Sequence, residues 1–65
     1  MYDTNMENIG KMIKYYRKSA NISIEDLGKA IGKSKTTVAR YENNEIILDI
    51  PTVIDICNVF NIDFN

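Results

Sequence analysis

The chain has 65 residues, a net charge of −1, a single cysteine and no histidine. This length allows one small hydrophobic core, and the composition excludes an internal disulfide and the usual ligand set of a zinc cluster. No apolar run approaches the ~20 residues of a membrane span. We therefore expect a single domain over residues 1–65, located in the cytoplasm and without a metal or other cofactor.

Enzyme function is not expected. The chain has no histidine for general base catalysis, no serine or cysteine paired with a general base, and no glycine-rich phosphate loop. The apolar surroundings of Cys57 in the sequence favour a small buried side chain over a reactive thiol.

The first predicted helix covers about residues 5–19. Its apolar side chains recur at spacings of four and three and form one face, namely Ile9, Ile13 and Tyr16. Lysines share the solvent side, namely Lys11, Lys14 and Lys18. Such a row is usually only a solvated face, and contact with a DNA backbone is the alternative. Asn21 follows as a natural left-handed turn residue.

Two short helices joined by a tight turn come next. Ser23 is a good N-cap for a helix over residues 24–31, and Asp26 completes the spacing of a capping box. Gly32 ends that helix, since glycine adopts the left-handed conformation without strain. Ser34 then caps a second helix. Two helices joined by so few residues cross steeply, which is the geometry of a helix-turn-helix motif.

The second of these helices covers about residues 35–43 and has two unlike faces. Val38 and Tyr41 point inward. The outward face carries hydrogen-bonding groups around one small residue, namely Lys35, Thr36, Ala39, Arg40 and Asn43. Lysine and arginine can donate to guanine, threonine can contact a base or a thymine methyl, and asparagine can pair with adenine. An ordinary solvated face would also be polar, but the glycine turn and the caps favour DNA binding.

A fourth helix is predicted over about residues 50–60, with Asp49 as its N-cap and Pro51 in its first turn. It is apolar almost all round, so it must be covered on two sides. One side is the domain core, and the other is either a fifth helix, starting at about residue 63, or a partner.

Further apolar residues lie in the loop before this helix and at the end of the chain, namely Ile46, Ile47, Leu48 and Phe64. Exposed apolar patches usually mark interaction sites, and we expect a dimer surface here. The alternative is that Ile46 and Leu48 fold back onto the core.

The net charge hides a strong segregation. Residues 11–40 hold all eight basic residues and only two of the nine acidic ones, for a formal charge of +6. Such asymmetry steers binding to nucleic acid more than the total charge does.

Residues 9–62 resemble the helix-turn-helix domain of the phage repressor and Cro family. The residues that carry the similarity are I-G at 9–10, I-K at 13–14, Arg17, L-G-x-x-I-G-x-S at 27–34, T-V-x-R-Y-E-N at 37–43 and the run at 52–62. The resemblance implies an all-α, compact bundle of four to five short helices. It also implies a homodimer that binds two half-sites of double-stranded operator DNA.

The resemblance also assigns roles by position. It implies contacts to base edges by Lys35, Thr36 and Arg40. It implies contacts to the DNA backbone by Ser23, Lys33, Ser34, Thr37 and Asn43. Arg17 and Glu42 match positions that form a buried ion pair in some relatives.

The chain departs from the family at three places. Ile24 stands where many relatives carry a glutamine that supports the phosphate backbone. Gly28 stands where alanine is usual, which keeps a close helix contact but weakens the helix by up to ~1 kcal/mol. The basic loop that often follows the position of Asn43 is absent. Asn44 suits a left-handed cap, so the turn itself should be kept.

Two functions therefore remain as hypotheses. The first is a sequence-specific, DNA-binding transcriptional regulator, most simply a dimeric repressor of phage or bacterial promoters. The second is a protein-interaction module of the same fold, such as an antitoxin or antirepressor. The basic recognition face favours the first, and the acidic remainder with its apolar loop leaves room for the second.

Overall fold

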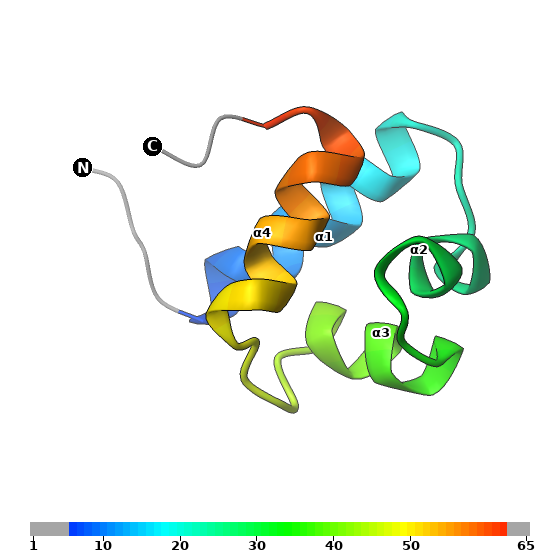
Figure 1. Ribbon diagram of the computed structural model, residues 1–65. Helices are drawn as coiled ribbons and strands as arrows, with labels where there is room; N and C mark the ends of the chain where they lie inside the picture. Colours follow the sequence, from blue (N-terminus) through cyan, green and yellow to red (C-terminus); the bar gives the residue numbers. More distant parts are fainter. Residues whose placement is uncertain (1–5, 63–65) are drawn as a thin grey trace.

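Four helices account for most of residues 6–62, the part of the chain that the computed structural model describes, with side chains from residue 9 onward. They are α1 (Met6–Ser19), α2 (Ile24–Ile31), α3 (Lys35–Glu42) and α4 (Ile50–Phe60). No strand occurs in this range. α1 and α4 lie side by side, while α2 and α3 pack against each other on one side of the pair (Figure 1). The all-α bundle with a helix-turn-helix is confirmed, whereas the predicted start of a fifth helix at residue 63 lies outside the described residues.

Side-chain caps begin three of the helices, as predicted. Ser23, Ser34 and Asp49 each accept a hydrogen bond from the backbone N–H three residues later, at 3.0 to 3.1 Å. Hydrogen bonds from the side chain and backbone of Thr52 hold the pKa of the Asp49 carboxyl below its ordinary value. The helix starts are thus determined by local chemistry that single residues supply.

All four helices end in the same way. A left-handed residue follows each helix, namely Asn21, Gly32, Asn44 and Asn61, with φ of 59°, 72°, 61° and 56°. The next backbone N–H then donates to the carbonyl oxygen five residues earlier. These pairs are Ile22–Arg17 at 3.2 Å, Lys33–Gly28 at 2.8 Å, Glu45–Arg40 at 2.9 Å and Ile62–Cys57 at 2.9 Å. This is the Schellman ending, which satisfies carbonyl groups and turns the chain sharply.

The turn between α2 and α3 depends on a glycine inside α2. A Cβ atom at Gly28 would lie 2.5 Å from the carbonyl oxygen of Lys33. The backbone of the turn would have to move to accept it, so Gly28 is part of the close approach between the turn and α2. Glycine at this position makes α2 less stable than alanine would. Its missing side chain lets the turn pack closely against α2, and this contact determines the position of α3.

One core lies between the four helices. Leu27 and Val38 are fully buried, and the other buried hydrophobic residues around them are Ile13, Ile31, Tyr41, Leu48 and Ile56. Arg17, Glu42 and Thr52 are the buried polar or charged residues of the described chain.

In the loop before α4, the structure differs from the dimer surface expected there. Leu48 is only 9% exposed and belongs to the core, and Ile46 is half-buried against it, whereas Ile47 is 79% exposed. The side chains alternate because this segment is not helical, so successive residues point to opposite sides. The alternative, that Ile46 and Leu48 fold back onto the core, is therefore correct. Phe64 lies outside the described residues.

Candidate nucleic-acid interface

The outward face of α3 is the candidate interface. Val38 and Tyr41, at 0% and 6% exposure, fasten the inner face of this helix to the bundle. The opposite face leaves its polar side chains exposed, namely Lys35, Thr36, Arg40 and the C-cap Asn43. α2, which the short turn joins to α3, packs against α3 within the bundle (Figure 1). A polar helix presented in this way fits the DNA major groove, which is wide enough for an α-helix.

A buried ion pair fixes the C-terminal end of α3. Arg17 Nε donates to Glu42 Oε2 at 2.6 Å, and Nη2 donates to Oε1 at 3.2 Å. The Nη1 group donates to the carbonyl oxygen of Ile22 at 3.0 Å. One guanidinium thus joins the end of α1, the loop before α2 and the end of α3. The structure brings together the two residues that were expected to pair, and Glu42 faces the protein interior.

Three hydroxyl groups expected at the DNA backbone lie at the N-terminal ends of α2 and α3. Ser23 Oγ accepts from the N–H of Asp26, so its own hydrogen can still be donated to a phosphate oxygen. Ser34 Oγ accepts from the N–H of Thr37 and donates to Thr37 Oγ1 at 3.0 Å. Ser34 is thus engaged within the chain on both sides, whereas the Thr37 hydroxyl can donate outward. Lys33 is exposed in the same turn.

Arg40 has an acidic neighbour that the charge pattern of the sequence did not reveal. Its Nε lies 3.9 Å from Oε1 of Glu45, and the two side chains are 57% and 58% exposed. The left-handed turn at Asn44 brings Glu45 back beside Arg40. The asparagine that ends α3, followed at once by a glutamate, is the sequence signal that could have predicted this pair.

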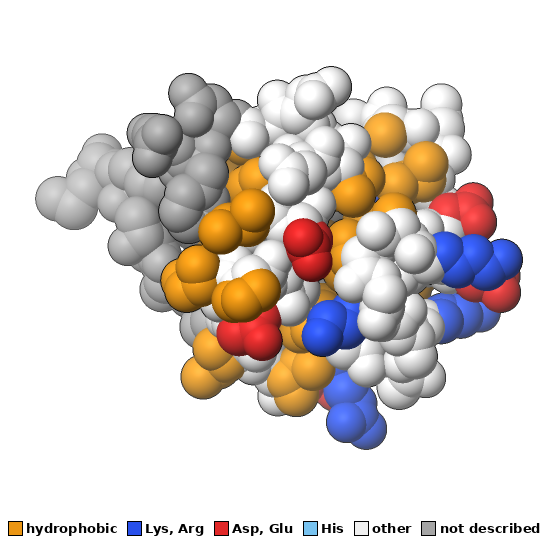
Figure 2. Space-filling view, in the orientation of Figure 1, with side chains coloured by type: hydrophobic (Ala, Val, Ile, Leu, Met, Phe, Trp, Pro, Cys, Tyr) orange, Lys and Arg blue, Asp and Glu red, His pale blue; other side chains and the backbone are white. Residues whose placement is uncertain are grey.

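Basic and apolar side chains gather on different parts of the surface. In Figure 2 the basic side chains lie over α2 and α3, while hydrophobic side chains gather over α4 and the loop before it. The exposed hydrophobic residues of this second region are Ile47, Ile50 and Ile54, at 79%, 62% and 41% exposure. We call these three residues the isoleucine patch. It keeps Ile47 from the predicted dimer surface, and Ile50 and Ile54 take the place of Ile46 and Leu48.

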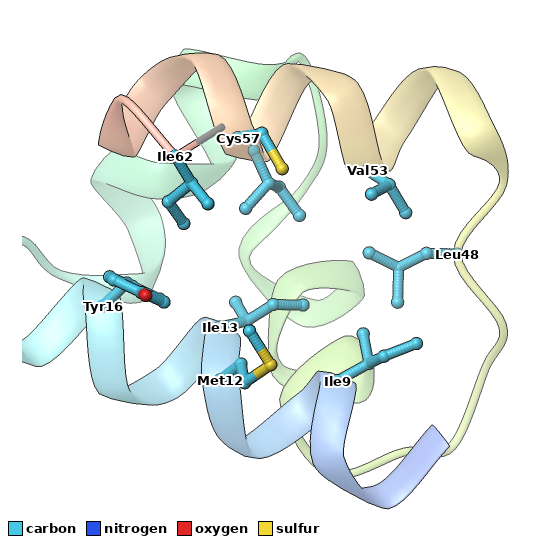
Figure 3. A pocket seen from close by; sticks show the side chains of 9 residues that line it. Ile9, Met12, Ile13, Tyr16, Leu48, Val53, Cys57 and Ile62 are labelled. Carbon is cyan, nitrogen blue, oxygen red and sulfur yellow. The ribbon is translucent and has the colours of Figure 1, made fainter. Parts of the chain in front are cut away.

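A cavity of about 130 Å³ lies between α1 and α4. Apolar side chains from both helices point into it, among them Met12 and Ile13 from α1 and Val53 and Cys57 from α4 (Figure 3). Cys57 is half-buried there as a free cysteine, in the apolar setting expected for it. The described side chains that line this cavity expose almost only apolar atoms to it.

Metal-ligating side chains do not cluster in the described part of the chain. Among residues 9–62, whose side chains the structure describes, no three His, Cys, Asp or Glu side chains come together as metal ligands would. None of the four described helices is both long enough and apolar enough to cross a bilayer.

Comparison with known proteins points to the same elements. A family model described as helix-turn-helix matches residues 13–65, which include α2, α3, α4 and much of α1. A search of curated proteins returned no match.

A double-mutant cycle tests whether Arg17 and Glu42 hold the bundle together. Arg17→Ala and Glu42→Ala should each lower the free energy of unfolding by about 3–5 kcal/mol, because either change strands a buried charge. The double replacement should cost less than the sum of the two, since no stranded charge remains. Urea unfolding followed by circular dichroism measures all three changes.

The exposed pair Arg40–Glu45 is the matched control for this cycle. It joins the same two residue types, but both side chains are more than half exposed. Its coupling should stay within about 1 kcal/mol. Additive losses at Arg17 and Glu42, or equal couplings for the two pairs, would contradict the structural role of the buried pair.

Proposed function

Since the chain belongs to the Cro/C1-type helix-turn-helix family of DNA-binding proteins, we propose that it is a sequence-specific transcriptional regulator acting as a dimeric repressor at phage or bacterial promoters. The observation that carries the proposal is the polar, basic outward face of α3 opposite the buried Val38 and Tyr41. Such a regulator acts in the cytoplasm, where its operator lies, and needs neither a metal nor catalysis.

The base-reading role goes to the exposed side chains of α3. Lys35, Thr36 and Arg40 lie on its outward face, where they can reach base edges. We assign contacts with the DNA backbone to residues at or near the helix ends, namely Ser23, Lys33, Ser34, Thr37 and Asn43. Among these, Ser34 contributes least, because its hydroxyl hydrogen is engaged with Thr37.

We infer a dimer from the small number of base pairs that one recognition helix can read. One recognition helix reads roughly three to five base pairs by the geometry of the motif, and so short a site recurs too often to specify an operator. Two protomers related by a two-fold axis would read two half-sites about one helical turn apart. The isoleucine patch is the surface that we assign to this contact, since it is apolar and separate from the basic face of α3.

The isoleucine patch also supports the second candidate function, a protein-interaction module such as an antitoxin or antirepressor. Ile47, Ile50 and Ile54 are all exposed, and an exposed group of apolar side chains of this kind usually marks an interaction site. In such a module the patch would contact a different protein, and α3 would show no preference among DNA sequences.

Selection of bound sequences from random duplexes tests the main proposal and yields an operator. Against that operator, Arg40→Ala and Lys35→Ala should each cost about 1–3 kcal/mol of binding free energy and relax the preference at defined base pairs. Fluorescence anisotropy with every single base-pair substitution measures both effects.

Lysines of α1 supply the control for these variants. Lys14→Ala and Lys18→Ala should at most weaken binding to all sequences equally, and should lower the salt slope by about one for each phosphate that the variant no longer neutralises. The recognition face is misassigned if both Lys35→Ala and Arg40→Ala bind the operator as tightly and as selectively as the parent.

Charges in the isoleucine patch test the dimer. With Ile47→Asp and Ile54→Asp together, a palindromic operator should bind protomers independently and more weakly, because two apolar surfaces can no longer pack. Native mass spectrometry and binding isotherms give stoichiometry and cooperativity. Tyr15→Asp, at a 66% exposed apolar residue of α1, is the control. Unchanged cooperative binding of two protomers would exclude this surface, and one protomer per operator in the parent would exclude the dimer.

A further inference from the structure

The relative position of Arg40 and Glu45 is determined by the backbone at the end of α3. Asn44 is left-handed, with φ 61°. The N–H of Asn44 donates to the carbonyl of Tyr41 at 3.2 Å, and the N–H of Glu45 donates to that of Arg40 at 2.9 Å. In this ending the side chain after the left-handed residue meets the side chain five positions earlier, usually through a hydrophobic contact. Here a carboxylate meets the outward arginine instead.

The carboxylate approaches one edge of the guanidinium. Glu45 Oε1 lies 3.9 Å from Nε of Arg40, which is too long for a hydrogen bond and makes the contact electrostatic. Arginine presents its donors in a rigid plane. A negative charge beside Nε therefore favours orientations that leave Nη1 and Nη2 to face outward, where they can donate to guanine O6 and N7.

The same carboxylate opposes binding to phosphates. Glu45 is 58% exposed in its side chain and lies at the border of the basic face of α3. Its charge competes with phosphate oxygens for the guanidinium of Arg40. Contact of Arg40 with the DNA backbone, which carries no sequence information, is weakened more than contact with a guanine edge.

We propose that Glu45 is a positioning residue that orients Arg40 toward a guanine edge and suppresses its binding to phosphates. The inference rests on the proposed function, DNA binding through α3. Its consequence is a larger specificity ratio, meaning the affinity for the operator divided by the affinity for a scrambled duplex of the same length and composition.

Glu45→Gln tests this role, because the change removes the charge and keeps the size. The affinity for the scrambled duplex should rise, and the specificity ratio should fall by about two- to fivefold, the range expected for an exposed ion pair. Discrimination should fall at the G·C pair that Arg40 reads, and the melting temperature should shift by no more than a few degrees. Glu25→Gln, at an exposed acid of α2, removes the same charge elsewhere and should leave the ratio as in the parent.

An Arg40→Ala background shows whether Glu45 acts through Arg40. There Glu45→Gln should change the specificity ratio no more than Glu25→Gln does, since the group that it positions is gone. A drop that persists in this background would mean that Glu45 acts on the DNA directly, and an unchanged ratio in the single variant would mean that it has no role. Either result overturns the inference. A parent that shows no operator preference overturns the proposed function, and the inference with it.

Discussion

The contact of Arg17 with Glu42 is the interaction on which the presentation of α3 depends. The guanidinium donates from three of its nitrogens to two partners, the Glu42 carboxylate and the Ile22 carbonyl, and so joins three separate parts of the chain. The backbone of α1 approaches the same point, because a Cβ at Gly10 would lie 2.7 Å from the Glu42 carbonyl oxygen. The charges are buried together, so neither can be removed alone without a large cost.

Different contacts hold the two ends of α3 in place. The N-terminal end is set by the Ser34 cap and by the close turn over Gly28, which places Lys35 and Thr36. The C-terminal end is set by Glu42, which points inward, and by the turn that follows. Arg40 lies between these anchors on the outward face. A small domain with a net charge of −1 can thus present a basic surface, because Glu42 is buried and other acidic residues, such as Asp49 and Asp55, lie at the start of α4 and within it.

Much of this arrangement could be predicted from single residues. Ser23, Ser34 and Gly32 act through their own local hydrogen bonds or backbone conformation, and the structure shows each in its predicted place. The inward position of Leu48 was one of two alternatives that the sequence left open, because loop residues lack the helical periodicity that distinguishes the core side from the solvent side. The approach of Glu45 to Arg40 required knowledge of how α3 ends. Among the predicted site residues, Arg17 and Glu42 are seen to pair in the structure. The roles of the other site residues are proposed contacts with DNA.

The central claim, that α3 reads operator DNA from the major groove, is tested most directly by methylation interference with dimethyl sulfate. This reagent modifies guanine N7, which lies in the major groove, and adenine N3, which lies in the minor groove. We expect that methylation of guanine N7 within each half-site blocks binding of the protein, while methylation of adenine N3 has no effect. Interference at adenine N3 alone, or at neither position, would contradict the account.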